Sequence, residues 1–170
     1  MRISKLMTIA TVLVFASSAA VFAQTAQTQD SASLTLTGSV AGRVSITVNG
    51  VGDFSSLNLM EDLNDEIIAE VTEQSNVSSG YTVTISSGNF ADGSPRFAGG
   101  AGSDTLAYSL SYDGEPIDFS SHAPVITDES DRLASVSGVT KNLAISYLGT
   151  AVNIVEGSYS DTLTFEIQAK

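Results

Sequence analysis

The stretch GSYSDTLTFEIQAK, residues 157–170, decides the fold. From Tyr159 onward apolar and polar residues alternate along it, with Leu163, Phe165 and Ile167 on one face and polar residues between them. A period of two residues is typical of a β-strand that buries one face. The sequence therefore predicts a strand whose free edge is covered either by an earlier part of the chain or by another molecule.

Upstream of this strand the chain is a series of short alternating segments, separated by Gly, Asn, Asp and Ser. Such segments are typical of strands joined by turns, and no long segment has the helical period of 3.6 residues. The pattern favours an all-β fold, an antiparallel β-sandwich of the immunoglobulin-like sort. The alternating segments are residues 34–40, 44–48, 67–71, 81–85, 106–112 and 143–147.

One segment has two readings. Leu57, Met60, Leu63 and Ile67 are spaced by three, three and four residues, which predicts a helix of one or two turns around residues 58–65. The other reading is that Ile67 begins a strand. Two further stretches, residues 89–104 and 120–138, are rich in turn residues and are predicted to be surface loops.

Residues 1–23 have the features of a secretory signal peptide. Arg2 and Lys5 give it a positive start, an apolar run follows, and small residues precede a cleavage position ahead of Gln24. Its removal leaves five basic residues against nineteen acidic ones, a net charge near −14. Such a chain is a poor partner for nucleic acid or an anionic membrane. We expect an exported protein with no membrane segment after signal removal and, without cysteine, no disulfide.

Residues suited to catalysis are scarce. His122 is the only histidine, and no G-x-S-x-G motif accompanies it. Two acidic groups in turn regions offer oxygen ligands for Ca²⁺, but neither has the spacing of a known calcium loop. We therefore expect no enzymatic activity, no cofactor and no metal site. The two acidic groups are Asp128, Glu129 and Asp131, and Asp113, Glu115 and Asp118.

Four stretches together resemble the spore coat U-like and other secreted pilins that bacteria assemble by the chaperone–usher route. The first is SLTLTGSVAGRVSITV, residues 33–48, followed by SGYTVTISSGN, residues 79–89, and LAYSLSYDG, residues 106–114. The closing stretch is the most specific, because Gly157 stands fourteenth from the end, ahead of the alternating strand.

The resemblance implies an immunoglobulin-like sandwich that lacks its last strand. Residues 24–42 would then be an N-terminal extension that donates a strand, and residues 43–170 the pilin-like domain. A periplasmic chaperone first fills the groove, and a neighbouring or related subunit replaces it at an outer-membrane usher by β-strand addition. The implied donor residues are Leu34, Leu36, Gly38 and Val40, and the implied groove residues are Gly157, Tyr159, Leu163, Phe165 and Ile167.

On this reading the protein is a structural subunit of a surface pilus or coat, with a role in cell adhesion, that passes through the periplasm to the cell surface. Two alternatives stay open. The N-terminal strand could fold back into its own domain, because only a short linker separates Val40 from Val44. The protein could then be a self-complemented extracellular binding module for a saccharide or Ca²⁺.

Overall fold

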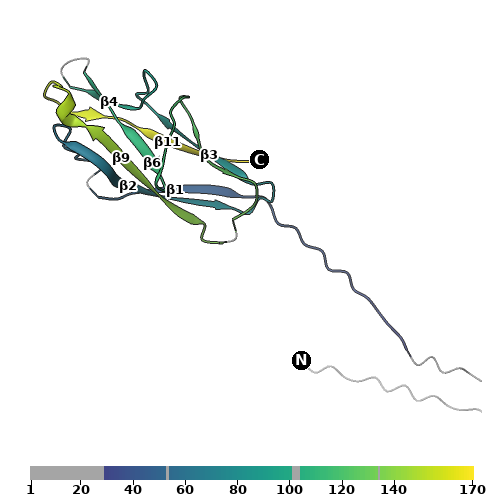
Figure 1. Ribbon diagram of the computed structural model, residues 1–170. Coiled ribbons are helices and arrows are strands. Elements are labelled where there is room, and N and C mark those ends of the chain that lie inside the picture. Colours follow the sequence, from purple (N-terminus) through teal and green to yellow (C-terminus); the bar gives the residue numbers. More distant parts are fainter. Residues whose placement is uncertain (1–28, 53, 101–103, 134) are drawn as a thin grey trace, which may run out of the picture. The chain divides into compact units, whose positions relative to one another are not determined.

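The computed structural model describes residues 29–52, 54–100, 104–133 and 135–170, and the chain divides into two units, Met1–Gly38 and Ser39–Lys170. The predicted signal peptide, residues 1–23, and residues 24–28 of the predicted extension lie outside the described residues. In residues 29–43 no strand is assigned. The rest of the described chain is all-β, with antiparallel sheets and no α-helix among the described residues (Figure 1).

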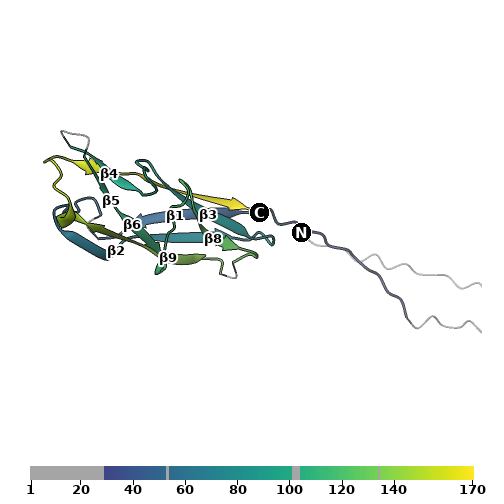
Figure 2. The same cartoon turned by 45° about the horizontal axis from the view of Figure 1, so that its top comes forward.

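The strands form three hydrogen-bonded sheets. The largest has the order β1-β2-β9-β6-β7, and the smaller ones have the orders β11-β3-β8 and β10-β4-β5. Figure 2 shows β4 and β5 toward one end of the unit and the end of β11 at the other. The elements are β1 (Val44–Gly50), β2 (Asp62–Ser75), β3 (Tyr81–Ser87), β4 (Arg96–Gly99), β5 (Thr105–Ala107), β6 (Ser109–Tyr112), β7 (Glu115–Pro116), β8 (Val125–Glu129), β9 (Val139–Leu148), the short 3₁₀ turn η1 (Gly149–Ala151), β10 (Tyr159–Ser160) and β11 (Leu163–Ala169).

The alternating residues of the sequence supply the core. In β3 every second residue is buried, and β2 and β9 also bury residues on their inward faces. The large sheet and the β11-β3-β8 sheet therefore cover one apolar interior. The main buried apolar side chains are Val71, Ile85, Leu106, Tyr108, Leu110, Tyr112, Leu143, Ile145 and Tyr147.

The predicted helix at residues 58–65 is wrong. Turns occupy this stretch until β2 begins at Asp62, because the strand pairs with β9 from its first residue, Asp62 opposite Leu148. The predicted common face of Ile67, Ala69 and Val71 is also interrupted. A register shift between Ile67 and Ala69 leaves Ile67 exposed while Ala69 is buried.

Two predicted strands are divided. The segment 106–112 bends at Tyr108 into β5 and β6, which belong to different sheets, and the closing strand breaks at residues 161–162 into β10 and β11. The two predicted loops each contain a strand, β4 in the first and β8 in the second. β4 has four residues and β8 has five, which is too short for alternation to mark either of them as a strand.

Candidate functional site

Two strand edges face each other without pairing. Among the described residues β1 pairs only with β2, and β11 pairs only with β3, yet Cα atoms of β1 and β11 approach within 8 Å. Val44 at the start of β1 lies opposite Ser75, and Ala169 at the end of β11 lies opposite Tyr81. Because a short turn joins Ser75 to Tyr81, β1 and β11 run antiparallel, and β1 begins near the place where β11 ends.

A cavity of about 490 Å³ opens between these two strands. Its walls are Val48 and Gly50 from β1 and Leu163 and Phe165 from β11. We call this cavity, with the two free edges beside it, the groove. Core residues form its floor, namely Ile68, Ala69, Tyr108, Leu143 and Ile145.

Val48 reveals that the groove is an uncovered part of the core. It stands opposite Val71 across the strand pair, so both side chains lie on the inward face of the sheet. Val71 is fully buried, whereas Val48 is 44% exposed. The difference in exposure arises because no described strand pairs with the edge of β1 that faces away from β2.

The predicted groove residues divide into two groups. Leu163 and Phe165 line the groove, and Ile167 is half-buried on the same inward face, opposite Val83. Tyr159 and Gly157 instead line a neighbouring cavity of about 410 Å³. There the hydroxyl of Tyr159 donates to the carbonyl of Val155 at 2.7 Å.

Gly157 lies where two segments of the chain approach each other closely. Its φ is +154°, and a Cβ atom built on it would stand 2.6 Å from the Cα atom of Gly100. The backbone therefore requires glycine here because two chain segments approach each other closely. Its position permits this approach at the end of the unit that carries β4 and β10.

The predicted donor residues are exposed. Leu34, Leu36 and Val40 are 84%, 85% and 88% exposed, and no other atom lies within 4 Å of the Cβ position of Gly38. These residues carry an alternating apolar face with no assigned strand partner among the described residues.

Two residues at the open end of the groove were missed from the sequence. Phe54 and Leu57 line it, and the Phe54 ring covers Gly50 so closely that a Cβ atom there would stand 2.3 Å from the ring. We call this end, between Gly50 and Leu163, the mouth. The sequence places Leu57 in a helical pattern, and Phe54 stands alone between polar residues, so alternation indicates neither residue.

Asp161 fixes the chain where β11 begins. Its carboxylate accepts hydrogen bonds from the Tyr108 hydroxyl and the Ser87 hydroxyl, both at 2.5 Å, and from the Asn89 backbone N–H at 3.0 Å. Burial, followed by the bond to Asp161, raises the pKa of Tyr108 well above its usual range. The contacts hold the start of β11 against β3 and so set one wall of the mouth.

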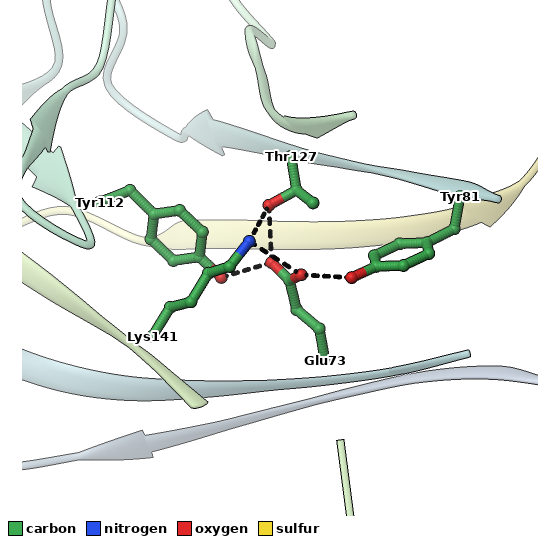
Figure 3. A network of polar contacts seen from close by, with 5 residues as sticks. All are labelled: Glu73, Tyr81, Tyr112, Thr127 and Lys141. Carbon is green, nitrogen blue, oxygen red and sulfur yellow. Dashed lines mark hydrogen bonds and ion pairs between the residues drawn. The ribbon is translucent and has the colours of Figure 1, made fainter. Parts of the chain in front are cut away.

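A polar cluster lies inside the core beneath the other end of the groove. The carboxylate of Glu73, on β2, is fully buried and accepts hydrogen bonds from the hydroxyls of Tyr81 at 2.9 Å, Tyr112 at 2.6 Å and Thr127 at 2.7 Å (Figure 3). The ammonium of Lys141 lies 3.2 Å from the same carboxylate. Four partners satisfy the charge, which would otherwise be costly in an apolar interior.

The environment of this cluster suits structure better than catalysis. Burial, together with the hydrogen bond to Glu73, raises the pKa values of Tyr81 and Tyr112 far above the usual value for tyrosine. Both phenols therefore stay protonated as donors. Because Glu73 is fully buried, a substrate has no access to its carboxylate. Glu73 could have been found from the sequence only as a charged residue on the inward face of residues 69–75.

The remaining candidate residues are His122 and the two acidic groups in turn regions. The Nε2 atom of His122 lies 3.1 Å from the Ser87 carbonyl, and its ring packs edge-on against Phe90. Within the described ranges, no three His, Asp or Glu side chains gather closely enough to hold a metal ion. Asp128, from one predicted acidic group, is paired with Lys170.

A scan of the sequence against protein-family models gives no match, and a search of curated proteins gives no match either. Within the described residues no helix is long and apolar enough to cross a membrane. The arrangement can nevertheless do one thing well. A free strand edge beside an apolar groove is a surface to which an extended segment can add, through main-chain hydrogen bonds and alternate side chains.

Proposed function

We propose that this protein is an exported structural subunit of a surface pilus or coat, assembled by donation of a β-strand between subunits. The domain would be an immunoglobulin-like sandwich without its final strand. The observation that carries the proposal is the pair of free edges, β1 and β11, with an apolar cavity between them. The exposed alternating segment 34–40 offers a strand of matching character.

The lengths and faces of the two partners agree. Segment 34–40 and β11 each span seven residues. Alternation places Leu34, Leu36 and Val40 on one face of the donated strand, toward the groove. Burial of each such side chain contributes about 1.5 to 3 kcal/mol, in addition to hydrogen bonds with a free strand edge.

The direction of donation determines what is built. The N-terminal segment leaves the domain where β1 begins, near the end of β11. A donated strand antiparallel to β11 would place the rest of the donor beyond the mouth, at the opposite end of the receiving subunit. Each subunit then donates a strand at one end and accepts a strand at the other. Such a head-to-tail contact does not close into a ring and therefore builds a fibre.

The proposed partners follow from the hazard of an open groove. An uncovered apolar strand edge promotes aggregation, so a subunit in transit would need a temporary cover. A periplasmic chaperone would supply it, an outer-membrane usher would catalyse the exchange, and neighbouring copies or related subunits would be the final partners. The predicted signal peptide supports the export that this route requires.

The test places a charge in the groove. In Phe165→Asp the carboxylate would lie on an apolar wall, where an unpaired charge is costly, so we expect assembly to be lost. Thr164→Asp is the matched control, because the neighbouring side chain is exposed on the outer face of β11. The measurement is the ladder of polymers on a gel without boiling. Wild-type ladders in Phe165→Asp would contradict the proposal and favour a self-contained binding module.

A further inference from the structure

We infer that Asn76 keeps the N-terminal segment out of the groove of its own domain, and so available to another subunit, by holding residues 41–43 in line with β1. We call these three residues the neck. The inference rests on the proposed function, because it concerns which groove the segment enters. It addresses a choice that the sequence pattern leaves open.

The contacts of Asn76 surround the neck. Its side-chain oxygen accepts a hydrogen bond from the Arg43 backbone N–H at 2.6 Å, and its side-chain nitrogen donates to the Ala41 carbonyl at 3.0 Å. Its own backbone N–H donates to the Arg43 carbonyl at 3.1 Å. Asn76 thus continues the β1–β2 pairing one position beyond Val44 and Ser75 and extends it along the chain to Ala41.

Without this restraint the segment could enter the groove of its own domain. A hairpin with the neck as a three-residue loop would place each inward residue of segment 34–40 beside an inward residue of β1. Leu36 would then reach Val48 and Leu34 would reach Gly50, both at the wall of the cavity. The full set of pairs would be Val40 with Val44, Gly38 with Ile46, Leu36 with Val48, and Leu34 with Gly50.

The neck also contains the residue that such a turn would use. Three-residue hairpin loops commonly place one residue in the left-handed region, and Gly42 can adopt it without strain. In the structure, however, the φ of Gly42 is not positive. Reversing the chain at Gly42 would break the bonds from Asn76 to Ala41 and Arg43, so these bonds favour the extended neck over the turn.

The test measures how the refolded protein divides between monomers, whose own segment fills the groove, and polymers. Mature wild-type protein, Asn76→Ala and Asn76→Asp are each refolded from denaturant by dilution, with or without a labelled peptide of residues 29–42. We expect Asn76→Ala to raise the ratio of monomer to polymer about fivefold, the change expected from losing two exposed hydrogen bonds at the weak end of their range. Asn76→Asp keeps the acceptor for Arg43 but loses the donor to Ala41, so an intermediate change is expected.

Ser45→Ala provides the matched control. It removes the bond from the Ser45 hydroxyl to the Gln74 side chain, at 2.9 Å on the same strand pair, without touching the neck. Its partition should equal that of wild type. Peptide uptake separates positioning from simple destabilisation, because Asn76→Ala monomers should take up less peptide than wild-type monomers if their own strand fills the groove.

Each result decides something. Unchanged partition in Asn76→Ala, or Asn76→Ala monomers that take up as much peptide as wild type, would overturn the inference. Wild-type protein that stays monomeric and refuses the peptide would overturn the inference and the proposed function together. Wild-type protein that stays monomeric but takes up the peptide would overturn the proposed fibre alone, since its own segment would still leave the groove free.

Discussion

Glu73 joins the large sheet and the β11-β3-β8 sheet through one side chain. The residue comes from β2, and its partners come from β3, β6, β8 and β9. No buried side-chain polar atom among the described residues lacks a hydrogen-bond partner, so the cluster adds no unsatisfied group to the core. A chain without disulfides relies on such contacts and on apolar packing to hold its layers in register.

High pH should weaken this cluster. The raised pKa values of Tyr81 and Tyr112 mean that the folded chain keeps phenolic protons that the unfolded chain releases near pH 10. The unfolded state then binds fewer protons, so the free energy of unfolding falls as the pH rises above that value. The contribution is fully present below the unfolded pKa. Urea midpoints measured at about pH 9 and about pH 11 should therefore differ, with the lower midpoint at high pH.

Tyr112→Phe isolates the phenol from lysines that titrate in the same range. This variant keeps the ring and leaves Glu73 with three partners, so we expect about 1 kcal/mol of lost stability near neutral pH. Between about pH 9 and about pH 11, the stability of Tyr112→Phe should fall by less than the stability of wild type. An equal fall in both proteins would show that Tyr112 does not carry the effect.

At the scale of the strand, segment 34–40 should act as a separable part. A chain that lacks residues 24–41 keeps β1 to β11 but has no strand to give or to fold back. We expect it to melt at a lower temperature than the chain complemented by a peptide of residues 29–42, because a ligand of the folded state stabilises it by mass action. Circular dichroism during heating measures the difference.

A peptide with aspartate in place of Leu34 and Leu36 is the control for this experiment. It keeps the backbone hydrogen-bonding groups but cannot fill the apolar groove, so it should give no stabilisation. If the shortened chain melts at the same temperature with and without the natural peptide, the groove does not accept this strand.

From Val44 onward, strands with uninterrupted alternation could be predicted from the sequence and strands with a break could not, whereas the alternating segment 34–40 forms no strand in the structure. β1, β3 and β9 lie where the apolar period indicated, and in β3 buried and half-buried residues alternate along the whole strand. The false helix around residues 58–65 arose because Leu57, Met60 and Leu63 happen to share a helical spacing. Nearby β2 gains its stability from pairing with β1 and β9, which local periodicity does not record.

The candidate site could be predicted only in part for the same reason. Leu163 and Phe165 follow from alternation, and both line the groove. Phe54 reaches the mouth from a turn, and Asn76 reaches the neck through side-chain bonds across 35 residues to Ala41. Such long-range contacts leave no periodic signal, so they became visible only with the fold.

At the scale of the whole assembly, one glycine should control chain length. In the antiparallel register that aligns segment 34–40 with β11, Gly38 comes opposite Phe165, where a small residue leaves room for the ring. Gly38→Leu would overfill this place at about 1 to 3 kcal/mol. The variant should still accept a strand through its own unchanged groove but give one poorly.

Mixing Gly38→Leu with wild-type protein therefore should shorten polymers in proportion to the amount added. Polymer length on gels without boiling gives the measurement. Thr37→Ser, on the opposite face of the donated strand, serves as a control with little change in size. Polymers of unchanged length at every mixing ratio would show that Gly38 does not face the groove.

The opposed directions of β1 and β11 also bear on mechanics. In the proposed fibre, a pull along the axis would draw the donated strand lengthwise past its two neighbours. The hydrogen bonds between strands lie across that direction, so all of them would resist the pull at the same time. When a strand is instead peeled from its end, the bonds break one after another. A fibre held only by noncovalent contacts would in this way resist shear along its whole length of pairing.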